Sequence, residues 1–388
     1  MRRYPTLLAL AVTVAGVLTG PGTAQAAPVT PSANDWIEVQ HPRPGGADTY
    51  LNDVVVPAAN DVWAVGYTFD VVGGAFEFRT YGQHCVSGVC TRANLPSREG
   101  APATNILYGI GAVSANELWT VGYSRDPREP GIGLTIHYTN GTWRIVDSPN
   151  PPGAFSSSLK AVSANSSTNA LAVGSYQDGS TLEERPLALG WDGATWRLIT
   201  VPTAPGCTDR GRLTDVTKLG GRYYVTGICR TTGGTEESYV LEVANRSWTT
   251  LLRPGDGTLE PGDALASITV VATAMLWAVG SNPATGTGVS LALRGSSWTN
   301  IPVPQAGQYT QLTGVAGTSR VDVWSVGATS QGAGPQRLSL RWTGQPRTWS
   351  IVPAGEATSL AAVAFDPAGY YWAVGHNNSV SVIQRRAW

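Results

Sequence analysis

The sequence predicts an all-β protein built from seven copies of one unit. A string that ends in glycine, "DVWAVG" at its first occurrence, returns with small changes along the chain. The final glycines of the seven strings are 56, 52, 53, 53, 47 and 48 residues apart. A period of about 50 residues, with about four strands in each unit, is what a blade of a β-propeller requires. We therefore expect a seven-bladed β-propeller of four-stranded antiparallel blades. The strings, which number the repeats from the first to the seventh, span residues 61–66, 117–122, 169–174, 222–227, 275–280, 322–327 and 370–375.

The second repeat shows all four strands of the expected blade. Asn140 and Gly141 are a strong hairpin signal, because both residues accept the backbone of a tight turn. Gly (46) and Pro (26) are abundant and only 14% of the residues are charged, which favours short strands and turns over long surface helices. The expected strands span residues 106–114, 117–124, 134–139 and 142–149.

The hairpin between the third and fourth strands recurs, with an aromatic residue before the turn and a tryptophan after it. Its first clear copy is "YTNGTW". In the first repeat the hairpin is "YGQHCVSGVCTR", so we expect a disulfide between Cys85 and Cys90 to replace the tryptophan. The copies span residues 138–143, 191–196 and 342–349, with weaker versions at 244–248 and 294–298.

The two ends of the chain together supply the seventh unit. After the last string only "HNNSVSVIQRRAW" remains, which is enough for about one further strand. The segment "SANDWIEVQHPRPGG" matches a fourth strand, since Trp36 aligns with Trp143 and Pro42 with Pro149. We therefore expect the last blade to be closed by the N-terminal strand, as in the ring of a propeller.

The repeated string also carries a packing pattern. Alternate residues of a strand face opposite ways, so Trp63 and Val65 share one face while Ala64 and Gly66 share the other. We expect the large face of each blade to pack against the small face of its neighbour, with the glycines allowing close approach. The large positions are Trp63, Trp119, Leu171, Tyr224, Trp277, Trp324 and Trp372.

This unit resembles the kelch repeat of seven-bladed propellers and the "VWAVG" repeats of secreted bacterial propeller proteins. The resemblance rests on a strand ending in glycine, an aromatic residue shortly before a tryptophan, and a proline-rich exit, and it covers nearly all of residues 33–388. The chain departs from the kelch pattern in having Val-Gly where that family has a glycine pair. "WDGATW" is similar to the Asp-box hairpin of sialidases, but the Ser/Thr-x-Asp spacing is missing.

The first 26 residues are typical of a secretory signal. Arg2 and Arg3 precede an apolar run from Leu7 to Leu18, and small residues end at Ala26, after which cleavage is expected. The run is shorter than the roughly 20 residues that a membrane span needs. We expect a secreted, extracellular protein whose residues 27–388 form a single propeller domain, with no membrane attachment after cleavage.

All four cysteines lie in the expected mature chain, and an even number in an oxidising compartment indicates two disulfides. Four cysteines allow three pairings. Sequence proximity favours Cys85 with Cys90 and Cys207 with Cys229.

Composition and motifs exclude several functions. A net charge of -1 gives no basic excess for nucleic acid. No histidine has a second histidine or a carboxylate at ligand spacing, and the serine-hydrolase, zinc-protease and phosphate-loop motifs are absent, so we expect no cofactor, no metal site and no catalytic residues. The copper radical site of galactose oxidase, another kelch-like propeller, needs a free cysteine, and here the cysteines are expected to be paired.

The loops between the second and third strands vary most from repeat to repeat, and divergent loops on a rigid scaffold often form a binding site. We expect them to bind glycan or protein partners without catalysis, in a monomer. The alternative is a carbohydrate-active enzyme, a polysaccharide lyase or glycoside hydrolase, with its site at the mouth of the central channel. An enzyme needs a concentrated acid and base set, such as His376 near Tyr67 or a carboxylate pair within residues 178–184. The candidate binding residues are Tyr67, Tyr123, Tyr176, Arg125, Asp178, Arg230 and His376.

Overall fold

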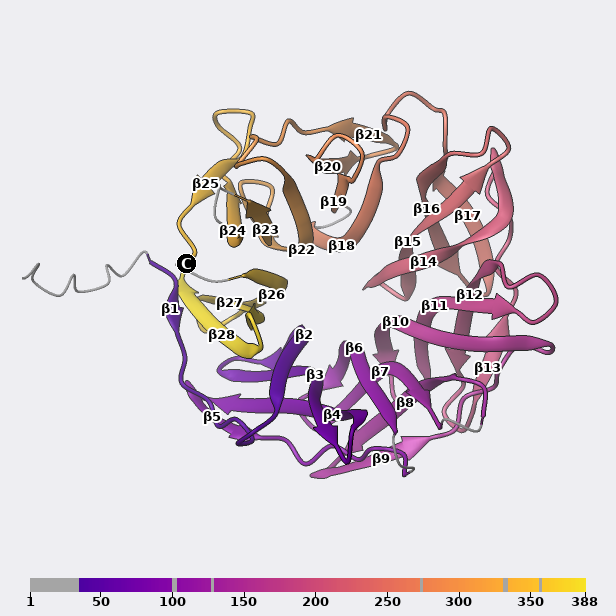
Figure 1. Ribbon diagram of the computed structural model, residues 1–388. Coiled ribbons are helices and arrows are strands. Elements are labelled where there is room, and N and C mark those ends of the chain that lie inside the picture. Colours follow the sequence, from indigo (N-terminus) through magenta and orange to yellow (C-terminus); the bar gives the residue numbers. More distant parts are fainter. Residues whose placement is uncertain (1–34, 100–102, 127–128, 273–274, 331–333, 356–357) are drawn as a thin grey trace, which may run out of the picture. The chain divides into compact units, whose positions relative to one another are not determined.

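The computed structural model describes residues 35–388 apart from 100–102, 127–128, 273–274, 331–333 and 356–357. Residues 33–388 form one compact unit. Every regular element in the described residues is a β-strand, and Figure 1 shows the strands grouped in sheets around a common centre. The expected signal peptide, residues 1–26, lies outside the described residues.

The strands occupy four positions, from the innermost of each sheet to the outermost. The innermost strands are β2 (Asp48–Ala58), β6 (Thr104–Ser114), β10 (Ala154–Ser166), β14 (Cys207–Leu219), β18 (Ala264–Ala272), β22 (Thr310–Ser319) and β26 (Ser359–Asp366). The second strands, which contain the glycine-ended strings, are β3 (Asp61–Val72), β7 (Glu117–Arg125), β11 (Asn169–Asp178), β15 (Arg222–Thr231), β19 (Met275–Asn282), β23 (Asp322–Ser330) and β27 (Tyr370–Asn377). The third strands are β4 (Ala75–Val86), β8 (Ile132–Thr139), β12 (Glu184–Trp191), β16 (Glu236–Ala244), β20 (Thr287–Arg294), β24 (Pro335–Trp342) and β28 (Val380–Ala387). The outermost strands are β5 (Val89–Arg92), β9 (Thr142–Val146), β13 (Trp196–Ile199), β17 (Ser247–Leu252), β21 (Ser297–Asn300), β25 (Ser350–Val352) and β1 (Ile37–Glu38).

The strands form five four-stranded sheets and one eight-stranded sheet. The larger sheet contains the strands of the first two repeats, joined by a single parallel pair between Phe78 of β4 and Thr104 of β6. This connection exists because the short β5 pairs only with residues 83–86 of the 12-residue β4, so the outer edge of β4 at Phe78 is open to the start of β6. All other pairings between the described strands are antiparallel, as expected.

The N-terminal strand completes the sheet of the C-terminal strands. β1 pairs with β28, with Ile37 opposite Arg385, and the sheet order is β1-β28-β27-β26. Trp36, just before β1, lies edge-on to Trp324 with ring centroids 5.7 Å apart. The segment that aligned with the fourth strand of other repeats therefore occupies that position.

The glycine at the end of each string is required by a bulge in its own sheet. Gly122 pairs with Leu107, and the ladder shifts register between Leu107 and Gly109. A Cβ on Gly122 would lie 1.9 Å from the carbonyl oxygen of Ile106 on the adjacent inner strand. The assignment of these glycines to close approach between neighbouring blades is therefore wrong. Equivalent backbone clashes, at 1.9 to 2.2 Å, affect Gly66, Gly174, Gly280, Gly327 and Gly375, and a Cβ on Gly227 would meet the ring of Tyr239 in its own sheet.

Large residues of one repeat do pack against small residues of the next. Trp119 is fully buried and packs with Ala170 and Ala172 of the third repeat. Trp372 packs with Ala64, which joins the seventh repeat to the first. We call each contact between successive repeats a junction and number it by the earlier repeat.

The hairpin aromatics belong to these junctions. At the second junction, Trp119 contacts Trp191 and Trp196, with ring centroids 4.8 and 4.9 Å apart. At the first junction Trp63 contacts Tyr138 and Trp143 in the same way. Trp277 contacts Trp342 and Trp349 in the same way, so at the first, second and fifth junctions the tryptophan of the string is covered by the aromatic pair of the following hairpin.

Both expected disulfides form. Cys85 and Cys90 lie opposite each other in the β4–β5 hairpin and pack with Trp372, where other junctions hold the aromatic pair. Cys207 and Cys229 join β14 to β15 with their Cα atoms 5.7 Å apart. Two disulfides indicate an oxidising environment. Within the described part of the chain, no helix has the length and apolar character to cross a membrane.

Candidate functional site

The innermost strands surround a cavity of about 460 Å³. Residues from β2, β6, β10, β14, β18, β22 and β26 all line it, so it is the central channel. The chain has 26 lysine and arginine residues, and both of its lysines, Lys160 and Lys218, line this channel.

A shallow pocket of about 430 Å³ adjoins the channel, at the ends of β7 and β11. We call it the mouth pocket. Tyr123 and Tyr176, both predicted binding residues, line it together with Lys160, which the channel shares. The full lining is Tyr108, Tyr123, Ser156, Ser157, Ser158, Lys160, Ser175, Tyr176, Gln177 and Glu184.

Lys160 is the cation of the mouth pocket. It stands at the bulge of β10, and its Nζ lies 3.6 Å from the centroid of the Tyr108 ring. Burial lowers the pKa of Lys160, Glu184 raises it and Arg212 lowers it further. Among the described residues Nζ has no hydrogen bond or ion pair, so its three donors are open to a ligand or water.

Glu184 supplies the acceptor of the pocket and is held by two neighbours. Its Oε1 accepts a hydrogen bond of 2.6 Å from Ser175 Oγ, and its Oε2 lies 3.5 Å from a guanidinium nitrogen of Arg212. Arg212 also pairs with Glu236 at 3.3 Å. The carboxylate is therefore fixed in position, and its charge is partly balanced.

Phenol rings continue from the mouth pocket toward the first and seventh repeats. Tyr67 stacks on Tyr50 with centroids 4.8 Å apart, and the His376 ring lies 5.2 Å from Tyr50. Burial raises the pKa of Tyr67, and the phenols of Tyr50 and Tyr108 raise it further. The structure therefore brings Tyr67 and His376 together around Tyr50, which the sequence analysis did not select.

His376 is not placed as a free base. Its Nε2 is 3.0 Å from Ser359 Oγ, its Nδ1 is 3.0 Å from the carbonyl oxygen of Asn378, and burial lowers its pKa. Both ring nitrogens lie within hydrogen-bond distance of neighbours in the same repeat, so we assign His376 a structural role.

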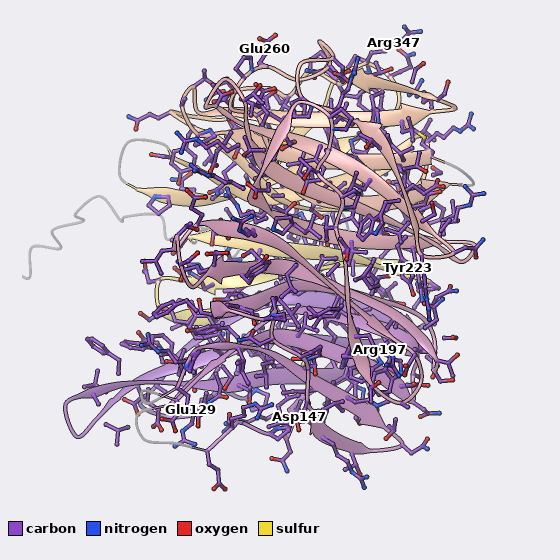
Figure 2. All side chains as sticks on the ribbon, turned by 90° about the vertical axis from the view of Figure 1, so that its right-hand side faces the viewer. Glu129, Asp147, Arg197, Tyr223, Glu260 and Arg347 are labelled. Carbon is purple, nitrogen blue, oxygen red and sulfur yellow. A yellow bond between two sulfur atoms is a disulfide. The ribbon has the colours of Figure 1, made fainter. Side chains whose placement is uncertain are left out.

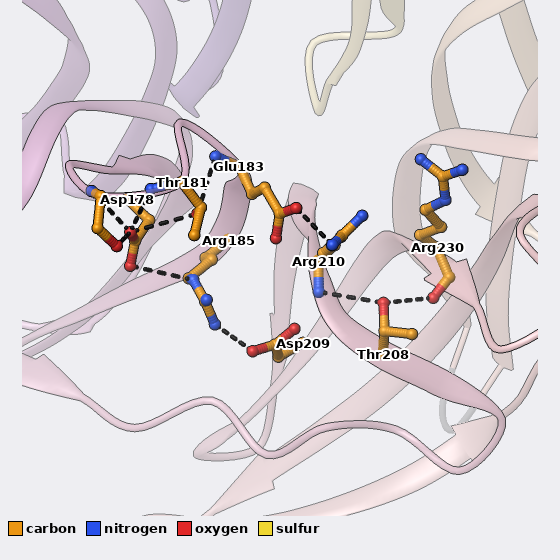
Figure 3. Close-up of polar contacts among 9 residues, drawn as sticks. Asp178, Thr181, Glu183, Arg185, Thr208, Asp209, Arg210 and Arg230 are labelled. Atoms are coloured by element: carbon orange, nitrogen blue, oxygen red, sulfur yellow. Dashed lines mark hydrogen bonds and ion pairs between the residues drawn. The ribbon is translucent and has the colours of Figure 1, made fainter.

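The other predicted residues lie away from the mouth pocket. Arg185 bridges Asp178, at 3.5 Å, and Asp209 (Figure 3). Hydrogen bonds from Ser180 and Thr181 lower the pKa of Asp178 to about 2. Figure 3 shows that these pairs tie the β11–β12 turn to the start of β14.

Arg230 and Arg125 are exposed and separate. The Arg230 carbonyl accepts a hydrogen bond from Thr208. Arg125 lines a different pocket of about 250 Å³ with Arg98 and Glu129. The seven predicted residues therefore do not form one site.

The predicted loops are shorter than expected. Tyr67, Tyr123, Tyr176, Arg230 and His376 lie inside the second strands, which run on past the glycine, rather than in the loops that follow. Residues on strands are held more rigidly than loop residues, which favours a preformed site.

Sequence analysis missed the contributions of the innermost strands. Tyr108 and Lys160 both stand one position after the leucine that faces the string glycine. Two features of the sequence could have indicated them: a Leu-x-x-Val/Ile pattern that recurs in the innermost strands, and the presence of only two lysines in the chain.

Two channel carboxylates, also missed, are structural. Asp53 accepts backbone hydrogen bonds from Val54 and from Ile110 of the next repeat, each at 2.8 Å. Burial raises the pKa of Asp53 to about 7. Asp215 makes the same bonds to Val216 and Ile268, so each carboxylate joins two innermost strands. No group of three or more His, Cys, Asp or Glu side chains in the described residues is arranged to hold a metal ion.

Comparison with known proteins decides the fold. No family model and no curated protein matches the sequence. The WD40 β-propeller domain of Doa1 superposes with a TM-score of 0.53 at 10% identity, over 90% of this chain and 96% of that one. The chain has a β-propeller fold.

Two enzymes share this propeller likeness. A Hadza microbial sialidase gives a TM-score of 0.53 at 12% identity, covering 80% of this chain and 73% of that one. The GH74 xyloglucanase from Xanthomonas campestris gives 0.56 at 14% identity, over 90% of this propeller and 53% of the enzyme. Identities this low establish the fold and leave activity to the residues of the site.

Proposed function

We propose that the chain is a secreted, kelch-like seven-bladed β-propeller. The eight-stranded sheet is two four-stranded blades that touch through one residue pair, which brings the count to seven. Seven hydrophobic clusters in the described residues support this count, since each contains residues of two successive repeats. The two disulfides agree with secretion.

The proposed function of this propeller is to bind a glycan at the mouth pocket. The observation that carries the proposal is the ammonium of Lys160, held on the Tyr108 ring beside the fixed carboxylate of Glu184. Sugar hydroxyls need donors and acceptors side by side, and sugar rings present C–H faces that pack on aromatic rings. Tyr123 and Tyr176 supply such rings in the same lining.

Binding is favoured over hydrolysis at this pocket. A glycoside hydrolase uses a pair of carboxyl groups on either side of the bond that it cleaves. Glu184 is the one carboxylate among the described residues that line the mouth pocket. It is held by Ser175 and Arg212, which suits an acceptor better than a proton donor.

A glycan array and titration with the bound oligosaccharide test this proposal. Lys160→Met should weaken binding about tenfold or more, since a hydrogen bond to a charged group contributes about 1.5–3 kcal/mol. Lys218→Met is the matched control. Lys218 lines the channel but not the mouth pocket, and its Nζ donates to the carbonyl oxygens of Ala112 and Ala164. Array silence, or equal losses in both variants, would contradict glycan binding at the mouth pocket.

A further inference from the structure

The largest pocket described lies at the third junction, outside the proposed glycan site. It has a volume of about 650 Å³ and is lined by the β10–β11 turn and by residues of the third and fourth repeats. We call it the junction pocket. Arg197 and Tyr223, two of its lining residues, are labelled in Figure 2, on the side of the molecule away from Glu129.

The junction pocket coincides with a break in the repeat. Leu171 stands where the other six repeats have tryptophan or tyrosine. In the hairpin of the fourth repeat, Val243 lies opposite Trp248. The matching residue in the hairpin of the third repeat, at the second junction, is Trp191, which lies opposite Trp196. Leu171 and Val243 both line the pocket, so it opens where two aromatic rings of the repeat are missing.

A third small residue enlarges the same region. Gly190 pairs across the strands with Leu171 and also lines the pocket. In the first and second repeats the residue at the position of Gly190 is a histidine. His84 stacks on Trp63 and His137 stacks on Trp119, with ring centroids 3.8 and 3.9 Å apart. The third junction therefore lacks a string ring, the ring that stacks on it, and one ring of the following hairpin.

The remaining walls are fixed and partly apolar. The hydroxyl of Tyr223 donates to the carbonyl oxygen of Asn169 at 3.0 Å, which holds the ring against the pocket. Burial raises the pKa of Tyr223 to about 12, so this phenol stays protonated. Arg197 is paired with Asp192 at 2.5 Å on the rim.

We propose that the junction pocket binds a small molecule with a planar aromatic ring, of the size of indole. The other junctions show which group this position accommodates, because the first, second and fifth hold three aromatic rings there. Apolar cavity walls that lack a ring bind aromatic molecules in place of the missing side chain, and Leu171, Tyr223 and Val243 form the apolar part of this wall. The proposal does not depend on the glycan site, which lies at the other end of the strands.

Indole is the probe for this proposal. Titration calorimetry and saturation-transfer NMR of the full chain with indole should show saturable binding, and indole should shift the NMR resonances of Leu171 and Tyr223, which line the pocket. Leu171→Trp and Val243→Trp each restore one ring of the repeat and should weaken indole binding tenfold or more. Lys160→Met is the control, since Lys160 lines the mouth pocket and the channel but not the junction pocket, and it should leave indole affinity unchanged.

A crystal with 5-bromoindole locates the ligand without any variant. Bromine between Leu171, Gly190 and Val243 supports the proposal even if both tryptophan variants fail to fold. The absence of saturable indole binding at millimolar concentration, bromine at another place, or unchanged affinity in two folded variants would overturn it.

Discussion

The second and third junctions have the same strand pairing but different side chains between the sheets. At the second junction Trp119, Trp191 and Trp196 contact one another, and Trp119 is fully buried. At the third junction Leu171 and Val243 pack in one cluster with no ring in either position. Both strings keep the same pairing with their inner strand, with Gly122 opposite Leu107 and Gly174 opposite Leu159.

The comparison shows which features of the repeat both junctions share and which feature differs between them. The glycine and its bulge occur at both junctions, whereas the aromatic triad occurs at one. Strand geometry thus sets the repeat, and the aromatic rings fill the space that remains between neighbouring sheets. The third junction lacks the triad, and the junction pocket opens there beside the ring of Tyr223.

The largest expected effect is the loss of a ring from the second junction. Trp119→Ala should reduce the free energy of unfolding by about 3–5 kcal/mol, because it removes a fully buried side chain from between two other rings. Leu171→Ala should cost about 2 kcal/mol, since it extends a pocket that is already open. Urea unfolding followed by far-ultraviolet circular dichroism measures both.

The order of the two losses tests the comparison. Phe76→Ala, at an exposed ring of the β3–β4 hairpin, is the control and should change stability by less than about 0.5 kcal/mol. A larger loss for Leu171→Ala than for Trp119→Ala would show that the third junction is the better packed one.

The glycines should give equal and intermediate effects at the two junctions. In Gly122→Ala the new Cβ meets the Ile106 carbonyl oxygen at 1.9 Å, and in Gly174→Ala it meets that of Ser158 at 2.1 Å. Each substitution should cost about 2 kcal/mol, since the inner strand must shift to relieve the contact. The same urea titration checks this. Unequal losses would mean that the glycine serves the junction rather than the bulge.

The strands, the closing pair and both disulfides could be predicted because they repeat or lie close in sequence. Trp36 aligned with Trp143, and the structure pairs its strand with β28. The role of Gly122 could not be predicted, since alternation alone does not show that the inner strand bulges toward it. The single pair that joins the first two repeats depends on how little of β4 is covered by β5, which strand patterns do not set.

The candidate site was predictable only in part. Tyr123 and Tyr176 were selected from the variable segments that follow the glycine, and they do share a pocket. Lys160 was missed because the packing of separate strands, β6, β10 and β12, rather than any local motif, brings it beside Tyr108 and Glu184. Arg125 was selected from the same loop as Tyr123, yet its side chain lines a different pocket.

The smallest expected effect is a pH dependence of stability that the second junction has and the third lacks. Burial lowers the pKa of His137, although Glu117 raises it, and the ring stacks on Trp119; the third junction has Gly190 there. Because the folded pKa lies below the unfolded value of about 6.5, the folded state binds fewer protons, and stability falls as pH drops below about 6.5. One pKa unit corresponds to about 1.4 kcal/mol, and partial exposure keeps the effect below this. His137→Gln should remove that part of the decline between pH 7 and pH 5 in urea unfolding, whereas Leu171→Ala should leave its slope unchanged. An identical slope in His137→Gln and wild type would show that burial at the second junction does not govern this titration.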